Sequence, residues 1–387
     1  MPARLVALRL PPASFVVQLD RVWGDGDAVL PIPASAPELT VQRTLRALRP
    51  AVLRHLDGSG ELVDEPLADA PEVDDGVALV VPTSGSTGQP KGVVLTHDAL
   101  RASVSASLER LDCHEGERWL LALPVHHVAG IQVVLRSRAL GTEPVVGQPD
   151  DLGGGDTAHV SLVPTQLRRL LDAGVDLTRF RTILLGGARP DPDLLGAARD
   201  AGANVGVSYG MTETAGGCVY DGAPLDGVEV EVADDGRIRV RGTTLAAGYR
   251  TRQGTVPVAG EDGWFVTDDH GRLDADGRLE VLGRVDDVIV SGGMNVPAAA
   301  VAATLRSHPQ VRDAAVAGRH DAEWGEAVVA VIVPRDPDHP PSLEELRGHV
   351  RLEWPPAYAP RDLVVVAALP RDAMGKLPRA AVRLLVE

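Results

Sequence analysis

The chain has 387 residues and a mass of 40.7 kDa; 44% of its residues are hydrophobic and 24% are charged. This length and apolar content exclude a largely disordered chain and favour two domains, or one large α/β domain with an appendage. The net charge is −16, from 54 acidic and 38 basic residues, and no basic cluster interrupts it, so nucleic acid is not an expected partner.

The sequence shows no clear signal for export or membrane insertion. Its two cysteines, Cys113 and Cys218, are too few for a disulfide framework or a cysteine-rich metal site. Two prolines interrupt the N-terminal segment, and no apolar run approaches the roughly 20 residues of a membrane span. We therefore expect a cytoplasmic protein without stable membrane insertion.

The first part of the chain, residues 1–75, is weakly patterned, and one helix is predicted there, over 41–56. From residue 77 onward, short apolar runs alternate with helical patterns, which favours a mainly parallel sheet covered by helices. The strands predicted in this part are 77–81, 93–95, 119–123, 145–146, 159–163, 183–185 and 205–208, and the helices are 98–111, 164–173 and 192–201.

The pattern becomes β-rich after residue 221. Asp-Gly pairs separate short alternating runs there, as they do in hairpins. The runs are 228–232, 238–240, 264–266 and 279–282, and the pairs begin at residues 235, 262 and 276. We expect an α/β fold whose large N-terminal domain, residues 1–282, combines mixed, mainly parallel sheets with this β-rich subdomain.

The remaining segment has the size of a small α+β domain of roughly 100 residues. Its predicted elements are helices over 296–306 and 343–352, a short C-terminal helix, and strands over 314–317, 328–333 and 363–367. We place this C-terminal domain at residues 287–387.

Only two of the 38 basic residues are lysines, Lys91 and Lys376, and each neighbours a glycine. Codon bias alone could leave two lysines in an arginine-rich chain. A site that needs a compact ammonium, which the planar guanidinium of arginine cannot replace, explains them better. Both lysines are therefore expected to lie in functional loops.

Residues 82–92 read Pro-Thr-Ser-Gly-Ser-Thr-Gly-Gln-Pro-Lys-Gly and lie between two predicted strands. Glycines let backbone N–H groups turn towards an anion, the hydroxyls add donors, and Lys91 adds a positive charge. The segment is not a Walker A loop, because no Ser or Thr follows the lysine and a strand follows the loop. A flexible Gly/Ser turn is the alternative, but it does not explain the hydroxyls that end in Pro-Lys-Gly. The sequence thus predicts a polyphosphate-binding loop.

This loop resembles the phosphate loop of the adenylate-forming superfamily, which contains acyl- and aryl-CoA ligases, adenylation domains and luciferases. Five further segments resemble motifs of that superfamily in the same order, so the resemblance covers residues 77–387. They are 123–130 on the substrate side, 209–214 for adenine and magnesium, 263–269 for the ribose, 283–287 at the hinge and 370–376 around the second lysine. The resemblance implies that ATP activates a carboxylic acid as an acyl-adenylate, with Mg²⁺ as cofactor and CoA as cosubstrate.

The resemblance also implies roles for residues around the nucleotide. Lys376 would bridge the substrate carboxylate and the α-phosphate as the catalytic residue of the first half-reaction, and Glu213 would ligate Mg²⁺. The implied ATP-binding residues are Thr83, Ser84, Gly85, Ser86, Thr87, Gly88, Lys91, Tyr209, Gly210, Thr212, Asp269 and Arg284. Asp268 stands where the superfamily usually has glycine, which leaves open whether Asp268 or Asp269 holds the ribose.

Other implied roles concern the acyl group, CoA and domain motion. His127 would line the acyl pocket, with His126 as the alternative by one position, and Gly186 and Gly187 would flank the adenine and the acyl group. Asp286 would be the hinge residue of a 283–286 hinge that lets the C-terminal domain move. Gly292 and Gly293 would border the tunnel for the pantetheine arm of CoA.

The short length of the chain narrows the range of carboxylic acids expected as substrate. Only 82 residues precede Thr83, and this short form and the motif spelling resemble the o-succinylbenzoate–CoA ligases of menaquinone biosynthesis. Another aryl- or acyl-CoA ligase, or a stand-alone enzyme that loads a carrier protein, is the alternative within the same chemistry. An inactive nucleotide-binding protein is the alternative from another class, and the intact Lys376 and Glu213 argue against it. The short N-terminus also leaves room for a homodimer that would cover a sheet edge.

Overall fold

The computed structural model describes residues 3–84, 90–149, 157–251, 254–285, 288–292, 294–371 and 377–387. The chain divides into two compact units. The first comprises Met1–Pro190, Leu195–Val230 and Val240–Phe265, and the second comprises Asp191–Leu194, Glu231–Arg239 and Val266–Glu387. The domain boundary that the motifs place at residues 283–286 stays a prediction.

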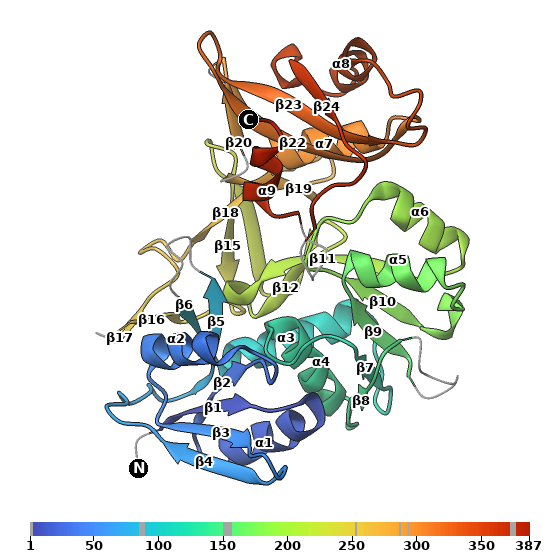
Figure 1. Ribbon diagram of the computed structural model, residues 1–387. Helices are drawn as coiled ribbons and strands as arrows, with labels where there is room; N and C mark the ends of the chain where they lie inside the picture. The colour runs from blue at the N-terminus through green and yellow to red at the C-terminus, as the bar shows by residue number, and fades with distance from the viewer. Residues whose placement is uncertain are drawn as a thin grey trace. The chain divides into compact units, whose positions relative to one another are not determined.

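The first unit contains an eight-stranded sheet with the order β17-β16-β6-β5-β2-β1-β3-β4 (Figure 1). Its central strands β5, β2, β1 and β3 are parallel, and antiparallel strands flank them on both sides. The elements are β1 (Leu5–Arg9), α1 (Pro12–Gly24), β2 (Ala28–Ile32), α2 (Glu38–Leu48), β3 (Val52–Leu56), β4 (Leu62–Pro66), β5 (Val77–Ser84), β6 (Pro90–Thr96), β16 (Gly248–Thr251) and β17 (Gly254–Val256).

The prediction for residues 1–75 was wrong, because this part holds four strands and two helices. Pro12 does not interrupt a segment; it opens α1 at a position whose N–H has no helical partner, where proline is favoured. Strand β2 is buried at all five positions and therefore shows no alternation. The predicted helix over 41–56 ends at residue 48, because Arg49 adopts a left-handed conformation (φ 48°) and Pro50 follows, so the chain continues as β3.

A second sheet of the first unit has seven strands in the order β13-β12-β11-β10-β9-β7-β8. Strands β7 to β11 are parallel, as predicted, and β12 and β13 are antiparallel additions. The elements are β7 (Trp119–Leu121), β8 (Val145–Val146), β9 (His159–Leu162), β10 (Thr182–Leu185), β11 (Val205–Met211), β12 (Gly216–Tyr220) and β13 (Ala223–Pro224), with the short η1 (Leu177–Arg179) and η2 (Thr212–Thr214).

Two helices, α3 (His97–Arg110) and α4 (Val128–Ala139), pack against each other between the two sheets (Figure 1). Helix α3 contacts β6 and β12, and α4 contacts β7 and β12. No predicted element covers α4, because this helix is buried on most sides and so lacks an amphipathic period. The remaining helices of this region are α5 (Pro164–Asp172) and α6 (Pro192–Asp200).

The β-rich subdomain is a four-stranded sheet with the order β14-β15-β18-β19. Its strands are β14 (Val228–Val232), β15 (Arg237–Gly242), β18 (Phe265–Leu273) and β19 (Leu279–Arg284). Strands β18 and β19 form an antiparallel hairpin in which Asp269 lies opposite Arg284. One residue of the predicted ribose motif and one of the predicted hinge motif are thus brought to one pair of strands.

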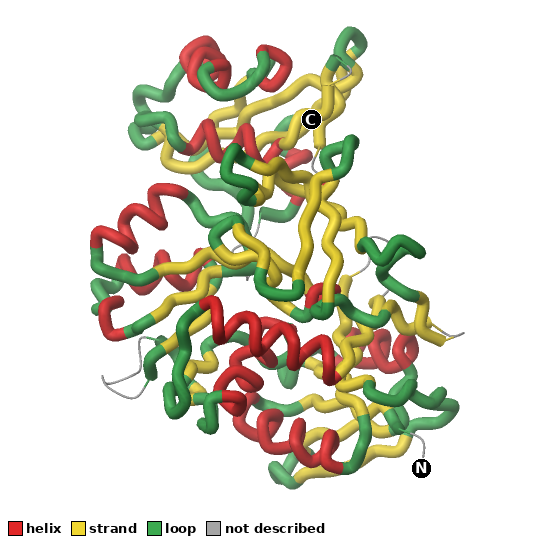
Figure 2. The backbone as a smooth tube through the Cα atoms, turned by 180° about the vertical axis from the view of Figure 1, so that it is seen from behind, coloured by secondary structure: helices red, strands yellow, loops and turns green. Residues whose placement is uncertain are grey.

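The C-terminal part of the second unit is a sheet with the order β21-β20-β23-β22 and β24 beside β23. Alternate residues of β22 and β23 form one core with α7 and α8 and another with the C-terminal helix α9. Helical segments accordingly lie on both sides of these strands (Figure 2). The elements are β20 (Val288–Ser291), β21 (Met294–Pro297), α7 (Ala298–Arg306), β22 (Val311–Asp321), β23 (Gly325–Pro334), α8 (Leu343–Arg351), η4 (Pro356–Tyr358), β24 (Asp362–Val365) and α9 (Arg379–Leu384).

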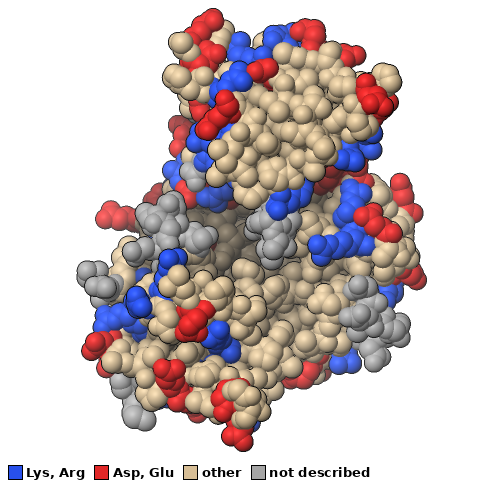
Figure 3. Space-filling view, in the orientation of Figure 1, with Lys and Arg blue, Asp and Glu red and all other residues tan. Residues whose placement is uncertain are grey.

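These sheets confirm the predicted fold class, an α/β protein with mixed, mainly parallel sheets, a β-rich subdomain and a small α+β C-terminal part. No helix within the described residues is long and apolar enough to span a membrane. On the face shown in Figure 3, acidic and basic side chains are interspersed.

Candidate active site

The glycine-rich segment connects two strands of a β-hairpin. Strand β5 pairs antiparallel with β6, Thr83 lies opposite Lys91, and the Thr83 hydroxyl donates to the Lys91 carbonyl at 3.5 Å. At Gly92 a Cβ atom would lie 2.6 Å from Val80 Cγ1 and 2.7 Å from Leu48 Cδ2, so only glycine lets β6 pass this close to the core. The glycine after the lysine thus has a packing role. Ser84 ends β5, and the predicted phosphate-loop residues Gly85, Ser86, Thr87 and Gly88 lie outside the described residues.

Lys91 lies beside a tyrosine of the neighbouring strand. Strand β16 pairs with β6, and Lys91 Nζ is 5.5 Å from the centroid of the Tyr249 ring, within cation–π range. The Tyr249 hydroxyl donates to Glu213 Oε1 at 2.9 Å. The structure therefore links two predicted site residues, Lys91 and Glu213, through a third that the sequence analysis did not single out. Its rarity could have drawn attention to it, since the chain has only four tyrosines.

The turn that carries Glu213 is fixed by a fully buried threonine. The Thr214 hydroxyl accepts from the Met211 amide at 2.9 Å and donates to the Gly216 carbonyl at 2.7 Å. The carbonyl of Glu213 accepts from the Ala246 amide at 2.8 Å. The backbone of Glu213 is thus held on both sides, while its carboxylate is half-buried. A carboxylate of this kind suits Mg²⁺, a hard cation that prefers oxygen ligands.

Two glycine motifs bring separate segments together near Tyr209, which is half-buried on β11. A Cβ atom at Gly210 would lie 2.0 Å from the Gly216 carbonyl oxygen, so β11 and β12 can approach this closely only with glycine. A Cβ atom at Gly186 would lie 2.6 Å from Ser208 Oγ. Gly187 then adopts a φ of +79°, which L-residues rarely adopt. The predicted Gly186-Gly187 segment therefore lies against the residue that precedes Tyr209.

The two adjacent histidines precede helix α4. His127 is the exposed N-cap residue, and its ring centroid lies 4.3 Å from that of the half-buried His126. Burial, assisted by the neighbouring His127, lowers the pKa of His126 to about 4, so His126 is neutral near pH 7. A Cβ atom at Gly130 would lie 2.2 Å from the Pro124 carbonyl oxygen, so this glycine lets the first turn of α4 pack on the preceding loop.

Helix α4 also carries Arg136, a buried residue that is only 3% exposed. Its guanidinium donates to the Gln132 carbonyl at 3.2 Å, to Ser107 Oγ at 3.2 Å and to Ser161 Oγ at 3.0 Å, and it lies 4.0 Å from the Trp119 ring centroid. These acceptors are neutral, and none of the described carboxylates forms an ion pair with Arg136. Burial lowers the pKa of Arg136 from its ordinary value. No sequence pattern distinguishes this arginine from the others.

The two aspartates that could bind the ribose both lie in the second unit, and they differ in exposure and in their arginine neighbours. Asp268 has a side chain that is 62% exposed and lies 3.3 Å from Arg237 and 3.5 Å from Arg284. Asp269 is 15% exposed, and its Oδ1 is 3.9 Å from Arg284 Nη1. Its amide donates to the buried Thr267 hydroxyl at 3.1 Å, which fixes the local backbone. Asp269 is therefore the less exposed of the two carboxylates.

Gly292 adopts a φ of +58°, and its amide donates to the Trp324 carbonyl at 2.9 Å. A Cβ atom there would lie 2.7 Å from Trp324 Cε3, so this turn accepts only glycine. The other residues predicted for this part of the site, Asp286, Gly293 and Lys376, lie outside the described residues, and their roles stay predictions.

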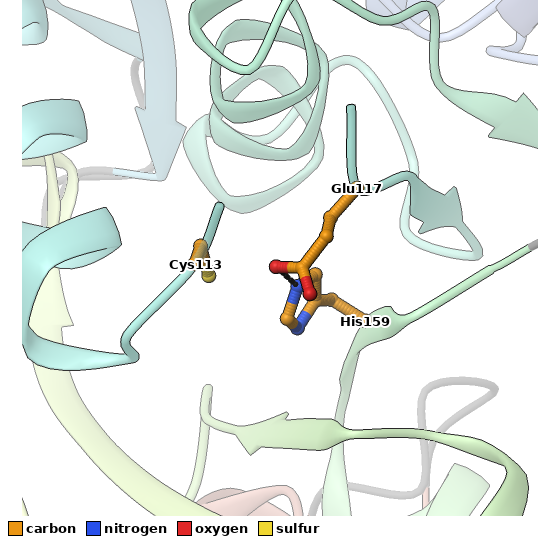
Figure 4. Close-up of side chains that lie close together, drawn as sticks. All are labelled: Cys113, Glu117 and His159. Atoms are coloured by element: carbon orange, nitrogen blue, oxygen red, sulfur yellow. Dashed lines mark hydrogen bonds and ion pairs between the residues drawn. The ribbon is translucent and has the colours of Figure 1, made fainter. Parts of the chain in front are cut away.

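A cluster outside the motifs joins Cys113, Glu117 and His159 (Figure 4), whose ligand-type atoms lie within 4.8 Å of one another. His159 Nε2 and Glu117 Oε2 are 2.9 Å apart, and Arg181 donates to the other oxygen of Glu117. Burial favours a higher pKa for Glu117, but hydrogen bonds from the His114 amide, His159 and Arg181 outweigh it and lower the pKa to about 2. Burial raises the pKa of the Cys113 thiol to about 12. In this structure the thiol is thus protonated near pH 7, and both carboxylate oxygens of Glu117 are engaged by hydrogen bonds.

Comparison with known proteins gives matches over most of the chain. The model of the AMP-binding enzyme family matches residues 13–250, and that of the AMP-binding enzyme C-terminal domain matches residues 300–376. A protein of Mycobacterium tuberculosis (strain CDC 1551 / Oshkosh) named "Probable 2-succinylbenzoate–CoA ligase" is 46% identical over 327 residues, which are 80% of this chain and 85% of that protein.

Two solved structures of o-succinylbenzoate CoA synthetase (MenE) from Bacillus subtilis share the fold. The complex with the acyl-adenylate intermediate OSB-AMP has a TM-score of 0.81 at 28% identity, and the match covers 99% of this chain and 88% of that one. The complex with ATP and magnesium ion has a TM-score of 0.80 at 28% identity, with 100% and 90% of the two chains covered.

The close approach at Gly210 predicts the effect of adding one methyl group. Gly210→Ala should destabilise the first unit by about 1–3 kcal/mol, the usual cost of overpacking, because either β11 or β12 must move. The matched control is Gly196→Ala on α6, where a Cβ atom meets no other atom within 4 Å and where alanine favours the helix. Denaturant unfolding measures both variants. Equal stability of the two would contradict the packing argument.

The lowered pKa of Glu117 predicts a pH-dependent contribution to stability. The ordinary value is 4.5 and the value in the fold is about 2, so the carboxylate stabilises the fold above pH 4.5 and this contribution is lost as the pH falls towards 2. Glu117→Gln should therefore lower the free energy of unfolding at pH 7, and the gap to the wild type should narrow below about pH 5. Glu115→Gln, at an exposed neighbour, is the control. A gap that does not change with pH would refute the assignment.

Proposed function

This chain belongs to the AMP-binding enzyme family, and on that premise we propose that it activates 2-succinylbenzoate with ATP and transfers the acyl group to CoA. The family resemblance predicted from six motifs is thereby confirmed. The main support for this substrate is the 46% identity, over 80% of the chain, to a protein named as a probable 2-succinylbenzoate–CoA ligase. The B. subtilis complexes with OSB-AMP and with ATP and magnesium support the same intermediate and cofactors.

The reaction has two steps. A carboxylate oxygen of the substrate attacks the α-phosphorus of ATP, the bond to pyrophosphate breaks, and an acyl-adenylate forms. The sulfur of CoA then attacks the acyl carbon, and AMP leaves as the thioester forms. Two anions have to meet in the first step, so the protein mainly has to position them and offset their charge.

In the first unit, the proposed ATP-binding residues come from β5, β6 and the loop between them, from β11 and from η2. Lys91 and the loop hydroxyls bind the phosphates, Thr212 donates to the α-phosphate, and Tyr209 presents its ring to the adenine. Glu213, whose carboxylate is half-buried, would hold Mg²⁺, and the charge of this ion offsets that of the phosphates. His127, Gly186 and Gly187 line the acyl side of the site in this proposal.

In the second unit, Asp269 accepts from the ribose hydroxyls with Arg284 beside it. The lower exposure of Asp269 favours it over Asp268. Lys376 acts on the α-phosphate, Asp286 is the hinge residue between a 1–282 domain and a mobile 287–387 domain, and Gly292 and Gly293 line the pantetheine tunnel. We also propose a cytoplasmic enzyme of menaquinone biosynthesis and a homodimer that covers the exposed edge strand β4.

The substrate has two carboxylates, so one negative charge remains after the other is activated. Arg136 is our candidate for binding the remaining carboxylate. Its charge is buried among neutral acceptors, so an anionic partner would stabilise it strongly. It lies nine residues beyond His127 along α4, which is about 13 Å along a helix axis.

The proposed substrate and the role of Lys376 are tested together by ATP–pyrophosphate exchange over a set of carboxylic acids. We expect exchange with 2-succinylbenzoate and a loss of about 10²–10³-fold in Lys376→Ala, because one group that stabilises developing charge is removed. Thioester formation from supplied acyl-adenylate should be largely spared in the same variant.

Other outcomes separate the alternatives. Exchange with fatty or amino acids but not with 2-succinylbenzoate would overturn the substrate, and transfer to a carrier protein in place of CoA would identify a loading enzyme. Nucleotide binding without pyrophosphate release would indicate an inactive protein.

The role proposed for Arg136 predicts a specific change in KM. Arg136→Met should raise the KM for 2-succinylbenzoate by about 10–100-fold, the cost of one charged hydrogen bond, and leave the KM for ATP within a few-fold. Steady-state kinetics measure both constants, and thermal unfolding shows whether the variant is folded. A folded variant with an unchanged KM for 2-succinylbenzoate would exclude Arg136 from substrate binding.

A further inference from the structure

Tyr249 lies between the two charged residues of the first unit that the motifs assign to ATP and magnesium. Its hydroxyl donates to Glu213 Oε1 at 2.9 Å, and its ring centroid is 5.5 Å from Lys91 Nζ. We infer that Tyr249 is a positioning residue that orients the Glu213 carboxylate for Mg²⁺ and holds the Lys91 ammonium for the phosphates of ATP. This inference rests on the proposed function, which assigns Glu213 and Lys91 to MgATP.

The hydroxyl orients a carboxylate without neutralising it. A carboxylate has two oxygens with two lone pairs each, and the Tyr249 hydrogen bond uses one lone pair of Oε1, so acceptor positions including all of Oε2 remain for the ion. An arginine or lysine in the same place would orient Glu213 equally well but would also offset its charge and weaken its attraction for a cation. The phenol of Tyr249 is neutral, so the negative charge of Glu213 stays available to attract the cation. Groups that fix a metal ligand in this way typically contribute 10–100-fold to metal affinity.

The ring holds a flexible cation without using its donors. A lysine side chain has several freely rotating bonds, and three N–H donors at its end. The face of an aromatic ring attracts the ammonium electrostatically and forms no hydrogen bond with it. Among the described residues no carboxylate forms an ion pair with Lys91, so the ring is the contact that the structure shows for its ammonium. All three donors stay available for phosphate oxygens.

The backbone on both sides of Tyr249 is closely packed or anchored by a hydrogen bond. At Gly248 a Cβ atom would lie 2.2 Å from the Val256 carbonyl oxygen, so β16 and β17 are in close contact there. Arg250 donates through Nε to the Leu48 carbonyl at 2.9 Å, which anchors β16 to the end of α2. The turn of Glu213 is fixed independently by Thr214. Tyr249 and Glu213 therefore meet from two supported segments, which is what a positioning contact requires.

A pair of variants separates the two parts of the role. Tyr249→Phe keeps the ring and removes the hydroxyl, so the Mg²⁺ concentration for half-maximal adenylation should rise by about 10–100-fold, while kcat at saturating Mg²⁺ stays within a few-fold of wild type. Tyr249→Leu removes the ring as well and should additionally raise the KM for ATP at saturating Mg²⁺. Tyr358→Phe, a hydroxyl deletion in the C-terminal part of the chain, is the matched control and should change neither constant.

Calorimetric titration with ATP gives a readout that does not depend on turnover. Tyr249→Phe should bind ATP more weakly than the wild type at low Mg²⁺ and equally well at saturating Mg²⁺. In a Glu213→Gln background the same change should have no further effect, because the carboxylate it orients is gone. An equal loss of ATP affinity at every Mg²⁺ concentration, or wild-type Mg²⁺ dependence, would overturn the inference. A wild type that binds MgATP but does not activate 2-succinylbenzoate would refute the proposed substrate and leave Tyr249 testable by the titration.

Discussion

Two anions, a triphosphate and a carboxylate, have to be brought into contact by a protein whose own net charge is −16. The site therefore needs positively charged side chains that are not already paired with acidic residues of the protein. Many of the described arginines are paired with aspartate or glutamate, as Arg54 is with Asp64 and Arg241 with Glu229. Lys91 lies instead over a neutral aromatic ring, and Arg136 is buried among neutral acceptors. Among the described residues, neither of these two cations forms an ion pair with a carboxylate.

The fold serves this arrangement through close approaches of strands. Glycine at positions 92, 210 and 248 lets β6, β12 and β17 come nearer to their neighbours than any side chain would allow. The hairpin that carries Lys91, the turn that carries Glu213 and the strand that carries Tyr249 are therefore closely packed against their neighbours. Because these segments are closely packed, few side-chain contacts are needed to orient the polar groups that they carry. A polar site of this kind is preorganised before its ligand binds.

The motifs and the fold class could be predicted from the sequence, because glycine-rich turns and buried parallel strands leave local patterns. The helix α4 and the strands β1 and β2 could not, since an element buried on most sides has no alternation, and the prolines at 11 and 12 look like interruptions although Pro12 begins α1. Strand β3 is only partly buried, and it was missed because the helix predicted over 41–56 extends across it. Tyr249 and Arg136 were missed for a different reason. Their importance depends on what lies beside them in space, Glu213 in one case and neutral hydroxyls in the other, and a single sequence carries no information on such contacts.

The structure of the protein with ATP and Mg²⁺ bound is the most direct test of this account. The expected result is an ion on Glu213 Oε2 while Oε1 still accepts from the Tyr249 hydroxyl, with the Lys91 ammonium on a phosphate oxygen and its stem against the tyrosine ring. An ion held without Glu213, or a Glu213 carboxylate that has left Tyr249 to pair with Lys91, would contradict it.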